Sequence, residues 1–230
     1  MLYVVGTPIG NLGDITLRAL ETLKKADVIL CEDTRHSLKL LNFYEIKKPL
    51  VAYHKFNERE ATERVLALLR EGKEVALISD AGMPLVSDPG AVLVARMKEA
   101  GLPFTVIPGT TAFVPALILS GFSAPFLFFG FLPDKKKDRR EALASLAGET
   151  ANLIFYCAPQ DMENTIKALY EAFGERRAAA VREITKIHEE AKEFLLSEGC
   201  PAVRGEYVLI VEGAKKRDTS PEIGEKEEIE

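Results

Sequence analysis

Short, unbroken apolar runs alternate with helical patterns along the first half of the chain. Runs of this kind, with no polar alternation, are typical of strands buried on both faces of a parallel sheet. The segments between them are amphipathic at helical spacing, as in Glu60–Arg70, which ends before Gly72. Five strands are expected, at residues 2–5, 28–30, 50–53, 75–78 and 104–107. This alternation predicts an α/β domain with a parallel sheet.

Polar residues mark where further helices between these strands begin. One helix is expected to open at Thr16, whose side chain can accept a hydrogen bond from a free backbone N–H, and another to continue through Leu38. A helix over Ala91–Lys98 is expected to have Asp88 as its N-cap and Pro89 in its first turn. These helices would cover the predicted sheet.

A second domain is predicted after a linker at Gly121–Pro125. The aromatic stretch Phe126–Phe131 opens it, and an amphipathic helix is expected to end at Gly174. Strands are expected at residues 152–156, 178–181 and 207–211. We therefore predict a chain of two α/β domains, residues 1–120 and 121–214, followed by a disordered charged tail at residues 215–230.

Charge and cysteine content narrow the class of protein. The 30 basic and 35 acidic residues give a net charge of −5, so any RNA binding would require a local basic patch. Cys31, Cys157 and Cys200 are odd in number and far apart, and no histidine has metal-ligand spacing with them, so neither a disulfide framework nor a metal site is expected. No apolar stretch reaches the roughly 18 residues that span a membrane, and no secretory leader is visible. A cytoplasmic protein is expected.

Loops of small residues follow several predicted strands. The most prominent, Ser79–Gly90, contains two Ser-Asp pairs, and Thr7–Asn11, Gly109–Ala112 and Tyr156–Pro159 are placed similarly. Ligands of open α/β sheets bind at the carboxyl ends of the strands. None of these loops holds a Lys or Arg for a phosphate, and neither G-x-G-x-x-G nor a P-loop motif occurs. A capped turn would explain any one loop, but together they predict a polar, largely uncharged cofactor with an adenosine part, bound between the domains.

Six motifs, in order and spread over nearly the whole chain, resemble those of one family. They are TPIGNLGDIT at 7–16, EDTRHS at 32–37, SDAGMPLVSDPG at 79–90, GFLP at 130–133, REITK at 182–186 and GEYVLIVEG at 205–213. This set resembles the tetrapyrrole methylase superfamily, and within it the branch that methylates a cytidine 2′-oxygen of bacterial 16S ribosomal RNA. Cys157 and Asp161 depart from that branch, which usually has Glu and Arg at these positions.

The resemblance implies a fold, a cofactor and a substrate. The fold is the non-Rossmann S-adenosylmethionine methyltransferase type, with two α/β domains and the cofactor in the cleft between them. The substrate is 16S ribosomal RNA within the small ribosomal subunit, and the enzyme is a homodimer that needs no metal and no membrane. By alignment, the cofactor contacts Ile9, Gly10, Asp80, Ala81, Gly82, Met83, Thr111, Ala112, Tyr156 and Cys157.

Four charged residues are candidates for the chemistry of ribose methylation. A ribose hydroxyl is a weak acid, so either a base or a cation that stabilises the alkoxide would help. The candidates are Lys186, Glu183, Asp33 and Asp88, and for each a salt bridge or a helix cap is at least as good an explanation. An extended chain would point Glu183 and Lys186 to opposite faces, whereas a tight turn between them would bring them together. In that case we expect Lys186 to act directly and Glu183 to orient it.

Two basic segments are candidates for RNA binding. The densest consists of Lys135, Lys136, Lys137, Arg139 and Arg140, and the other of Arg35, His36 and Lys39. A solvated, mobile loop is the alternative explanation of the first. Two other functions stay open: a small-molecule or protein-side-chain methylase of the corrin-ring or diphthine synthase type, which would not need these segments, and a catalytically silent RNA-binding protein, which would not need the cofactor loops.

Overall fold

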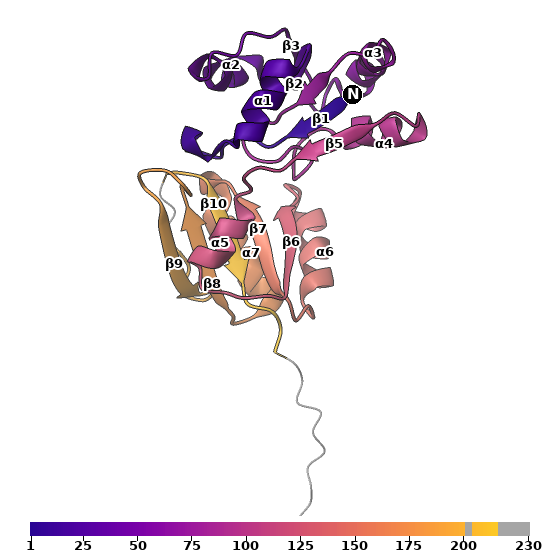
Figure 1. Ribbon diagram of the computed structural model, residues 1–230. Helices are drawn as coiled ribbons and strands as arrows, with labels where there is room; N and C mark the ends of the chain where they lie inside the picture. The colour runs from indigo at the N-terminus through magenta and orange to yellow at the C-terminus, as the bar shows by residue number, and fades with distance from the viewer. Residues whose placement is uncertain (201–203, 216–230) are drawn as a thin grey trace, which may run out of the picture.

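The computed structural model describes residues 1–200 and 204–215, and these form two α/β units, one above the other in Figure 1. The expected fold class, two α/β domains, is confirmed. The tail predicted to be disordered lies, beyond Lys215, outside the described residues. Within the described part of the chain, no helix is long and apolar enough to cross a membrane.

The first unit is built on a five-stranded sheet in which every paired strand is parallel, as predicted. The strands lie in the order β3-β2-β4-β1-β5, so β4, which precedes the Ser79–Gly90 loop, is central. Their bounds are β1 Leu2–Val5, β2 Val28–Cys31, β3 Leu50–Ala52, β4 Val75–Leu77 and β5 Phe104–Ile107. Because these strands run in one direction, the loops that follow them gather at one edge of the sheet.

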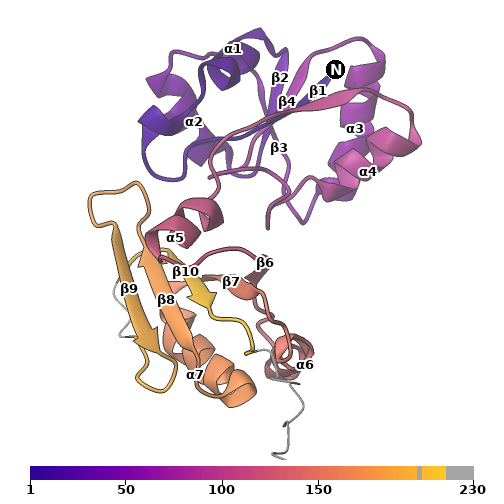
Figure 2. The same ribbon diagram turned by 60° about the horizontal axis from the view of Figure 1, so that its bottom comes forward.

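Helices cover both faces of this sheet (Figure 2). On one face, α1 (Leu17–Lys25) and α2 (Thr34–Phe43) bury side chains such as Leu23 and Leu41 against the strands. On the other, α3 (Glu58–Arg70) and α4 (Ala91–Glu99) contribute Leu66 and Leu93 to a second cluster. The central strands β1, β2 and β4 are largely buried and have no polar alternation, so apolar runs alone predict them.

The starts of two helices show one prediction confirmed and one wrong. Thr16 caps α1, since its Oγ1 accepts a hydrogen bond from the backbone N–H of Ala19 at 3.1 Å. Asp88 does not cap α4: the helix begins at Ala91, and its N-cap is Gly90 with φ of 132°. A carboxylate of α3 replaces the expected cap, because Glu58 Oε1 accepts the N–H of Gly90 at 2.7 Å. Asp88 is thereby left available outside the helix.

The second unit is a mixed sheet in the order β6-β7-β10-β8-β9. The bounds are β6 Phe126–Phe131, β7 Asn152–Cys157, β8 Arg177–Arg182, β9 Glu190–Leu195 and β10 Tyr207–Val211. Strand β6 is parallel to β7, but β10 runs antiparallel to both β7 and β8. The start of β10 therefore lies at the edge where β7 and β8 end, and this edge faces the first unit (Figure 1).

Helices pack on both faces of the second sheet too. Helices α6 (Lys136–Leu146) and α7 (Met162–Phe173) cover one face, where Leu143 and Leu169 are buried. Helix α5 (Phe113–Leu119) covers the other face, and its Ala116 packs with Val208 of β10. Although α5 precedes the predicted boundary at residues 120 and 121, it shares its core with the second unit. The boundary itself stays a prediction.

Strands β6 and β9 and helix α6 of the second unit were not predicted from the sequence, which indicated only an aromatic stretch where β6 lies. Strand β9 is an edge strand with five exposed residues of six, so it carries no apolar run. Helix α6 begins in the basic run, and its buried apolar positions, Leu143 and Leu146, come only after the charged residues. Its first turn makes the basic segment an ordered helical surface, so the alternative of a mobile loop does not describe residues 136–140.

Candidate functional site

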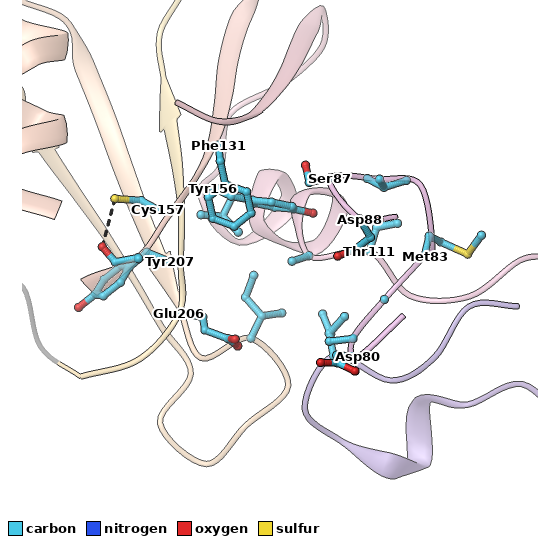
Figure 3. Close-up of a pocket in the computed structure, with 18 of the residues that line it drawn as sticks. Asp80, Met83, Ser87, Asp88, Thr111, Phe131, Tyr156, Cys157, Glu206 and Tyr207 are labelled. Carbon is cyan, nitrogen blue, oxygen red and sulfur yellow. Dashed lines mark hydrogen bonds between the residues drawn. The ribbon is translucent and has the colours of Figure 1, made fainter. Parts of the chain in front are cut away.

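A cleft of about 440 Å³ opens between the two units (Figure 3). Its first wall consists of the loops that follow β1, β4 and β5, and its second wall of the end of β7, the turn after β8 and the start of β10. Nine of the ten residues predicted to contact a cofactor line it: Ile9, Asp80, Ala81, Gly82, Met83, Thr111, Ala112, Tyr156 and Cys157. The structure thus brings together four loops that are far apart in the sequence. Contact with a cofactor stays a prediction.

Hydrogen bonds to Thr7 hold the three loops of the first wall together. Its backbone pairs with Gly82 in both directions, at 2.9 and 3.1 Å. Its hydroxyl donates to the carbonyl of Ser79 at 3.3 Å, and its carbonyl accepts from Thr110 Oγ1 at 2.6 Å. Thr7 is only 2 % exposed, so these hydrogen bonds are shielded from water. The hydrogen bonds of Thr7 therefore fix the three loops of the first wall relative to one another.

Carboxylates make the first wall negative. Asp80 and Asp88 line the cleft, and Glu32 lies close enough to interact with both of them. Burial raises the pKa of Asp88 to about 6, and the charges of Glu32 and Asp80 act in the same direction. Like charges so placed favour a cationic ligand group or a proton nearby. Among the described residues, no cluster of His, Cys, Asp and Glu has the geometry to hold a metal ion.

Lys186 reaches the cleft from a tight turn after β8. The N–H of Lys186 donates to the carbonyl of Glu183 at 2.9 Å, and Glu183 and Thr185 have positive φ values of 49° and 66°. The condition set from the sequence, a turn that brings Glu183 and Lys186 together, is thus met. Lys186 Nζ donates to Glu183 Oε1 at 3.0 Å and to Glu206 Oε2 at 2.8 Å.

The two carboxylates keep the Lys186 side chain cationic. Burial alone would lower the pKa of Lys186, but the hydrogen bonds to Glu206 and Glu183 outweigh it and raise the pKa. The pKa of Glu183 is lowered, first by the backbone N–H of Glu206 and then by Lys186. Lys186 can therefore present a positive charge to a ligand, but it cannot accept a proton near neutral pH.

Three other predicted residues lie beside the cleft and not in its lining. Gly10 lies beneath the Lys186 side chain. Glu183 is behind Lys186 and holds it. Asp33 caps α2 by accepting the N–H of Arg35 at 2.8 Å, and its own N–H donates to Asp80 Oδ1 at 3.2 Å. These positions fit a direct chemical role for Lys186 or Asp88 better than for Glu183 or Asp33.

Most of the predicted RNA-binding side chains are exposed. Those of α2 are Arg35, His36 and Lys39, and those at the start of α6 are Lys135, Lys136, Lys137 and Arg140. Arg139 differs, because its side chain is only 12 % exposed and its Nη2 pairs with Asp161 Oδ2 at 2.8 Å. Its Nε also donates to the carbonyl of Pro133 at 2.9 Å. Arg139 therefore fixes the loop before α6 and is turned away from the basic surface.

Several lining residues lie outside the small-residue loops predicted from the sequence. Besides Lys186, they are Phe131, Gln160, Ile184, Glu206, Tyr207 and Val208. In a parallel sheet the ligand loops lie at the carboxyl ends of the strands. Glu206 and Tyr207 begin a strand that is antiparallel to its neighbours, so they reach the same edge from the opposite direction. No pattern in the sequence distinguishes that direction.

Comparison with known proteins agrees with this architecture. The family model for Tetrapyrrole (Corrin/Porphyrin) Methylases matches residues 1–200. Ribosomal RNA small subunit methyltransferase I of Bacillus subtilis is 42 % identical over 96 % of this chain and 78 % of its own length. The protein of the same name from Mycoplasmopsis pulmonis is 45 % identical over 91 % of this chain and 96 % of its own.

A solved structure shares the fold. Uroporphyrin-III C-methyl transferase from Thermus thermophilus, complexed with S-adenyl homocysteine, superposes with a TM-score of 0.64 at 23 % identity, covering 92 % of this chain and 96 % of that one. At this identity the likeness concerns the fold alone. With the family model and the relatives taken together, the chain belongs to the tetrapyrrole methylase family and, within it, to the family of the ribosomal RNA small subunit methyltransferases I.

Proposed function

We propose that this protein is a methyltransferase that transfers the methyl group of S-adenosylmethionine to the 2′-hydroxyl of a cytidine in 16S ribosomal RNA of the small subunit. The observation that carries this proposal is the cleft itself. Small-residue loops and Lys186 meet there, in a chain whose relatives are named ribosomal RNA small subunit methyltransferases I. The relatives' name supports the RNA, and the resemblance of the motifs supports the cytidine ribose.

The lining of the cleft fits S-adenosylmethionine. Ala81, Gly82 and Ala112 leave room for a ligand close to the backbone, and Gly82 has a φ of 83°, which glycine adopts without strain. The negative wall of Asp80 and Asp88 suits a ligand that carries a sulfonium and an ammonium group. The cofactor supplies an electrophilic methyl group, and much of the acceleration comes from aligning the acceptor oxygen with it.

Two side chains of the lining serve the two other needs of the reaction, which are stabilising the developing alkoxide and accepting the proton of the hydroxyl. Lys186 is held as a cation by Glu183 and Glu206, so it stabilises negative charge that develops on the ribose oxygen. Asp88, and not Lys186, is suited to act as the base. A carboxyl with a pKa of about 6 is ionised at neutral pH and binds a proton more strongly than an ordinary carboxylate. Asp33 and Glu183 act through position, the first on Asp80 and the second on Lys186.

Exposed cations beside the cleft provide the RNA surface. The start of α6, with Lys135, Lys136, Lys137 and Arg140, is the primary candidate and the exposed face of α2 is the second. Neither surface requires a positive net charge of the protein, because salt screens charges beyond about 8 Å at physiological ionic strength and phosphates therefore respond to the local charge.

The cellular setting is part of the proposal. We expect a cytoplasmic homodimer, which the resemblance implies. The thiols of Cys31 and Cys157 are free, as is usual in a reducing compartment. Val114 and Ile118, one turn apart on α5, are 45 % and 74 % exposed and offer apolar surface to a second copy. Light scattering on the purified protein measures the dimer directly.

A methyl-transfer assay tests the proposed function. Purified protein is incubated with labelled S-adenosylmethionine, EDTA and small subunits that lack ribose methylation, and the RNA is digested to nucleosides. We expect label in 2′-O-methylcytidine. Methylated bases, or no label in RNA, would contradict the proposal, and retained RNA binding without transfer would favour the silent RNA-binding alternative.

A binding measurement isolates the cofactor. Calorimetry in EDTA should show S-adenosylmethionine binding to the wild type. Gly82→Leu should lose it, because a side chain at this position faces Ile9 Cγ2 at 3.3 Å and would fill the lining. Equal affinity of both proteins would reject this position of the cofactor, and binding that disappears with EDTA would reject the metal-free site.

A further inference from the structure

A second cavity of about 560 Å³ adjoins the cleft in the second unit. It lies at the carboxyl edge of β6 and β7, between the loop Phe131–Asp134 and the first turns of α7. Phe131, Tyr156 and Gln160 belong to the walls of both cavities. A ligand in the second cavity would therefore be next to a ligand in the cleft.

An exposed aromatic ring forms the shared wall. Phe131 is 58 % exposed although it is a large apolar residue, and its ring lies 5.4 Å from the ring of Tyr156 at an angle of 63°. Figure 3 shows both rings at the margin of the cleft. This edge-to-face arrangement leaves a face of Phe131 uncovered. Unstacked bases of single-stranded RNA bind on such faces.

The polar groups of the second cavity fall into a fixed floor and an open rim. On the floor, Asp161 is held by Arg139 at 2.8 Å and by Thr165 Oγ1 at 3.4 Å. At the rim, Asp134 and Gln160 are exposed. A carboxylate accepts a hydrogen bond from the exocyclic amino group of cytosine, whereas it would repel the carbonyl that uracil has at that position.

The basic surface begins at the same rim. Lys135, Lys136 and Lys137 follow Asp134 directly in the chain and are exposed on the first turn of α6. A cavity whose rim is continuous with a row of cations suits one base of a strand whose flanking phosphates lie along the row.

We propose that the second cavity takes the flipped-out base of the target nucleotide, a pyrimidine with an exocyclic amino group. Phe131 stacks on the base, and Asp134 is the residue that distinguishes cytosine from uracil. The ribose then lies at the shared wall, with its 2′-hydroxyl directed to the cleft. This inference rests on the proposed function, because it assigns a base to the RNA that the cleft would methylate.

Oligonucleotide binding tests the cavity independently of catalysis. Two fluorescein-labelled heptanucleotides, all-uridine or with one central cytidine, are titrated with protein saturated with S-adenosylhomocysteine. We expect the wild type to prefer the cytidine strand about 10-fold, within the discrimination of a good base contact. Asp134→Asn should bring the ratio close to 1. Asp138→Asn makes the same change of charge on an exposed residue of α6 and should leave the preference unchanged.

The stacking role has its own matched pair of variants. Phe131→Leu keeps the bulk but removes the aromatic face, and should weaken both strands by about 10-fold. Phe131→Tyr keeps the face and should bind as the wild type does. Equal affinity of the wild type for the two strands, or an unchanged preference in Asp134→Asn, would overturn the proposal. Failure of the proposed function would appear elsewhere, as an absence of methyl transfer to 16S ribosomal RNA by the wild type.

Discussion

The side chain of Lys186 lies against the backbone of Gly10, so the two units touch at this point of the cleft. A Cβ atom on Gly10 would come within 2.6 Å of Lys186 Cγ and 2.8 Å of its Cε. Carbon atoms in ordinary contact are about 3.5 to 4.0 Å apart, so this position of the lysine requires a residue without a side chain at position 10. Gly10 thus determines where the ammonium group is held.

Gly10→Ala should impair catalysis without unfolding the protein. The backbone of Gly10 is outside the left-handed region, so alanine fits it, and only the flexible lysine stem must move. A displacement of about 1 Å can cost about 10²-fold in rate, and we expect a fall in kcat of that order. Gly148→Ala is the matched control, because a Cβ there meets nothing within 4 Å. Equal kcat values for both variants would show that the position of Lys186 is not critical.

Lys186→Ala should lower turnover on small subunits by about 10²- to 10³-fold, the usual cost of removing one donor that stabilises a developing anion. S-adenosylmethionine should still bind, as calorimetry can measure. Glu206→Gln removes one of the two carboxylates that hold Nζ, so it should give a smaller loss. Near-normal turnover of Lys186→Ala would remove this residue from the mechanism and leave Asp88 as the main candidate.

Replacing Lys135, Lys136, Lys137 and Arg140 together with Gln should weaken RNA binding and flatten its salt dependence. For single-stranded RNA, the log–log slope falls by about 0.7 for each phosphate that the protein no longer neutralises. Cofactor affinity should be unchanged. If the slope is unaltered, the exposed face of α2 is the main RNA surface.

Arg139 is expected to behave differently from its four neighbours. Arg139→Gln should reduce the free energy of unfolding by about 1 to 3 kcal/mol, because it leaves the half-buried carboxylate of Asp161 without its partner. Its effect on the salt slope should be small. Urea unfolding and RNA titration of the same variant separate the two effects, and a large change of slope with unchanged stability would place Arg139 on the RNA.

The first unit was predictable because its strands are parallel and apolar, and its central strands β1, β2 and β4 are largely buried. Apolar runs identify such strands, and the loops after them must share one edge, so the cofactor loops could be grouped from the order of residues alone. In the second unit, this rule does not predict every residue of the cleft. Strand β10 is antiparallel to β7 and β8, and Glu206 at its start reaches the site from a direction that apolar runs do not encode.

Two other discrepancies involve contacts between distant residues. Asp88 has the position and type of a good N-cap, but Glu58, 32 residues away from Gly90, takes that role. Arg139 has the charge of an RNA ligand, but Asp161, 22 residues away, pairs with it. Asp161 is also one of the positions that depart from the related branch. In both cases the residue type would allow the predicted role. A contact with a residue far away in the sequence determines the role that is observed.

Asp88 should give the rate of methyl transfer a pH dependence. If it is the base, it must be ionised, so the rate should fall about 10-fold for each pH unit below its pKa of about 6. In Asp88→Asn this limb of the profile should be absent and the rate low at all pH values. A wild-type rate that is flat from about pH 5 to 8 would exclude this role.

Asp88 should also reduce the stability of the protein at neutral pH. Burial raises its pKa from 3.8 in the unfolded chain to about 6, so the folded protein binds this proton more strongly. Stability therefore falls as the pH rises from about 4 to 6, and the cost persists above that range. The shift corresponds to at most about 3 kcal/mol, and partial exposure reduces this to about 1 to 2 kcal/mol.

Asp88→Asn should accordingly be more stable than the wild type at about pH 8 by that amount and equally stable at about pH 4, measured by urea unfolding. Asp33→Asn serves as the control of opposite sign: the N–H of Arg35 lowers the pKa of Asp33, so its loss should not stabilise the protein at the higher pH. Stabilisation by both variants would mean that general charge repulsion, and not burial of Asp88, is the cause.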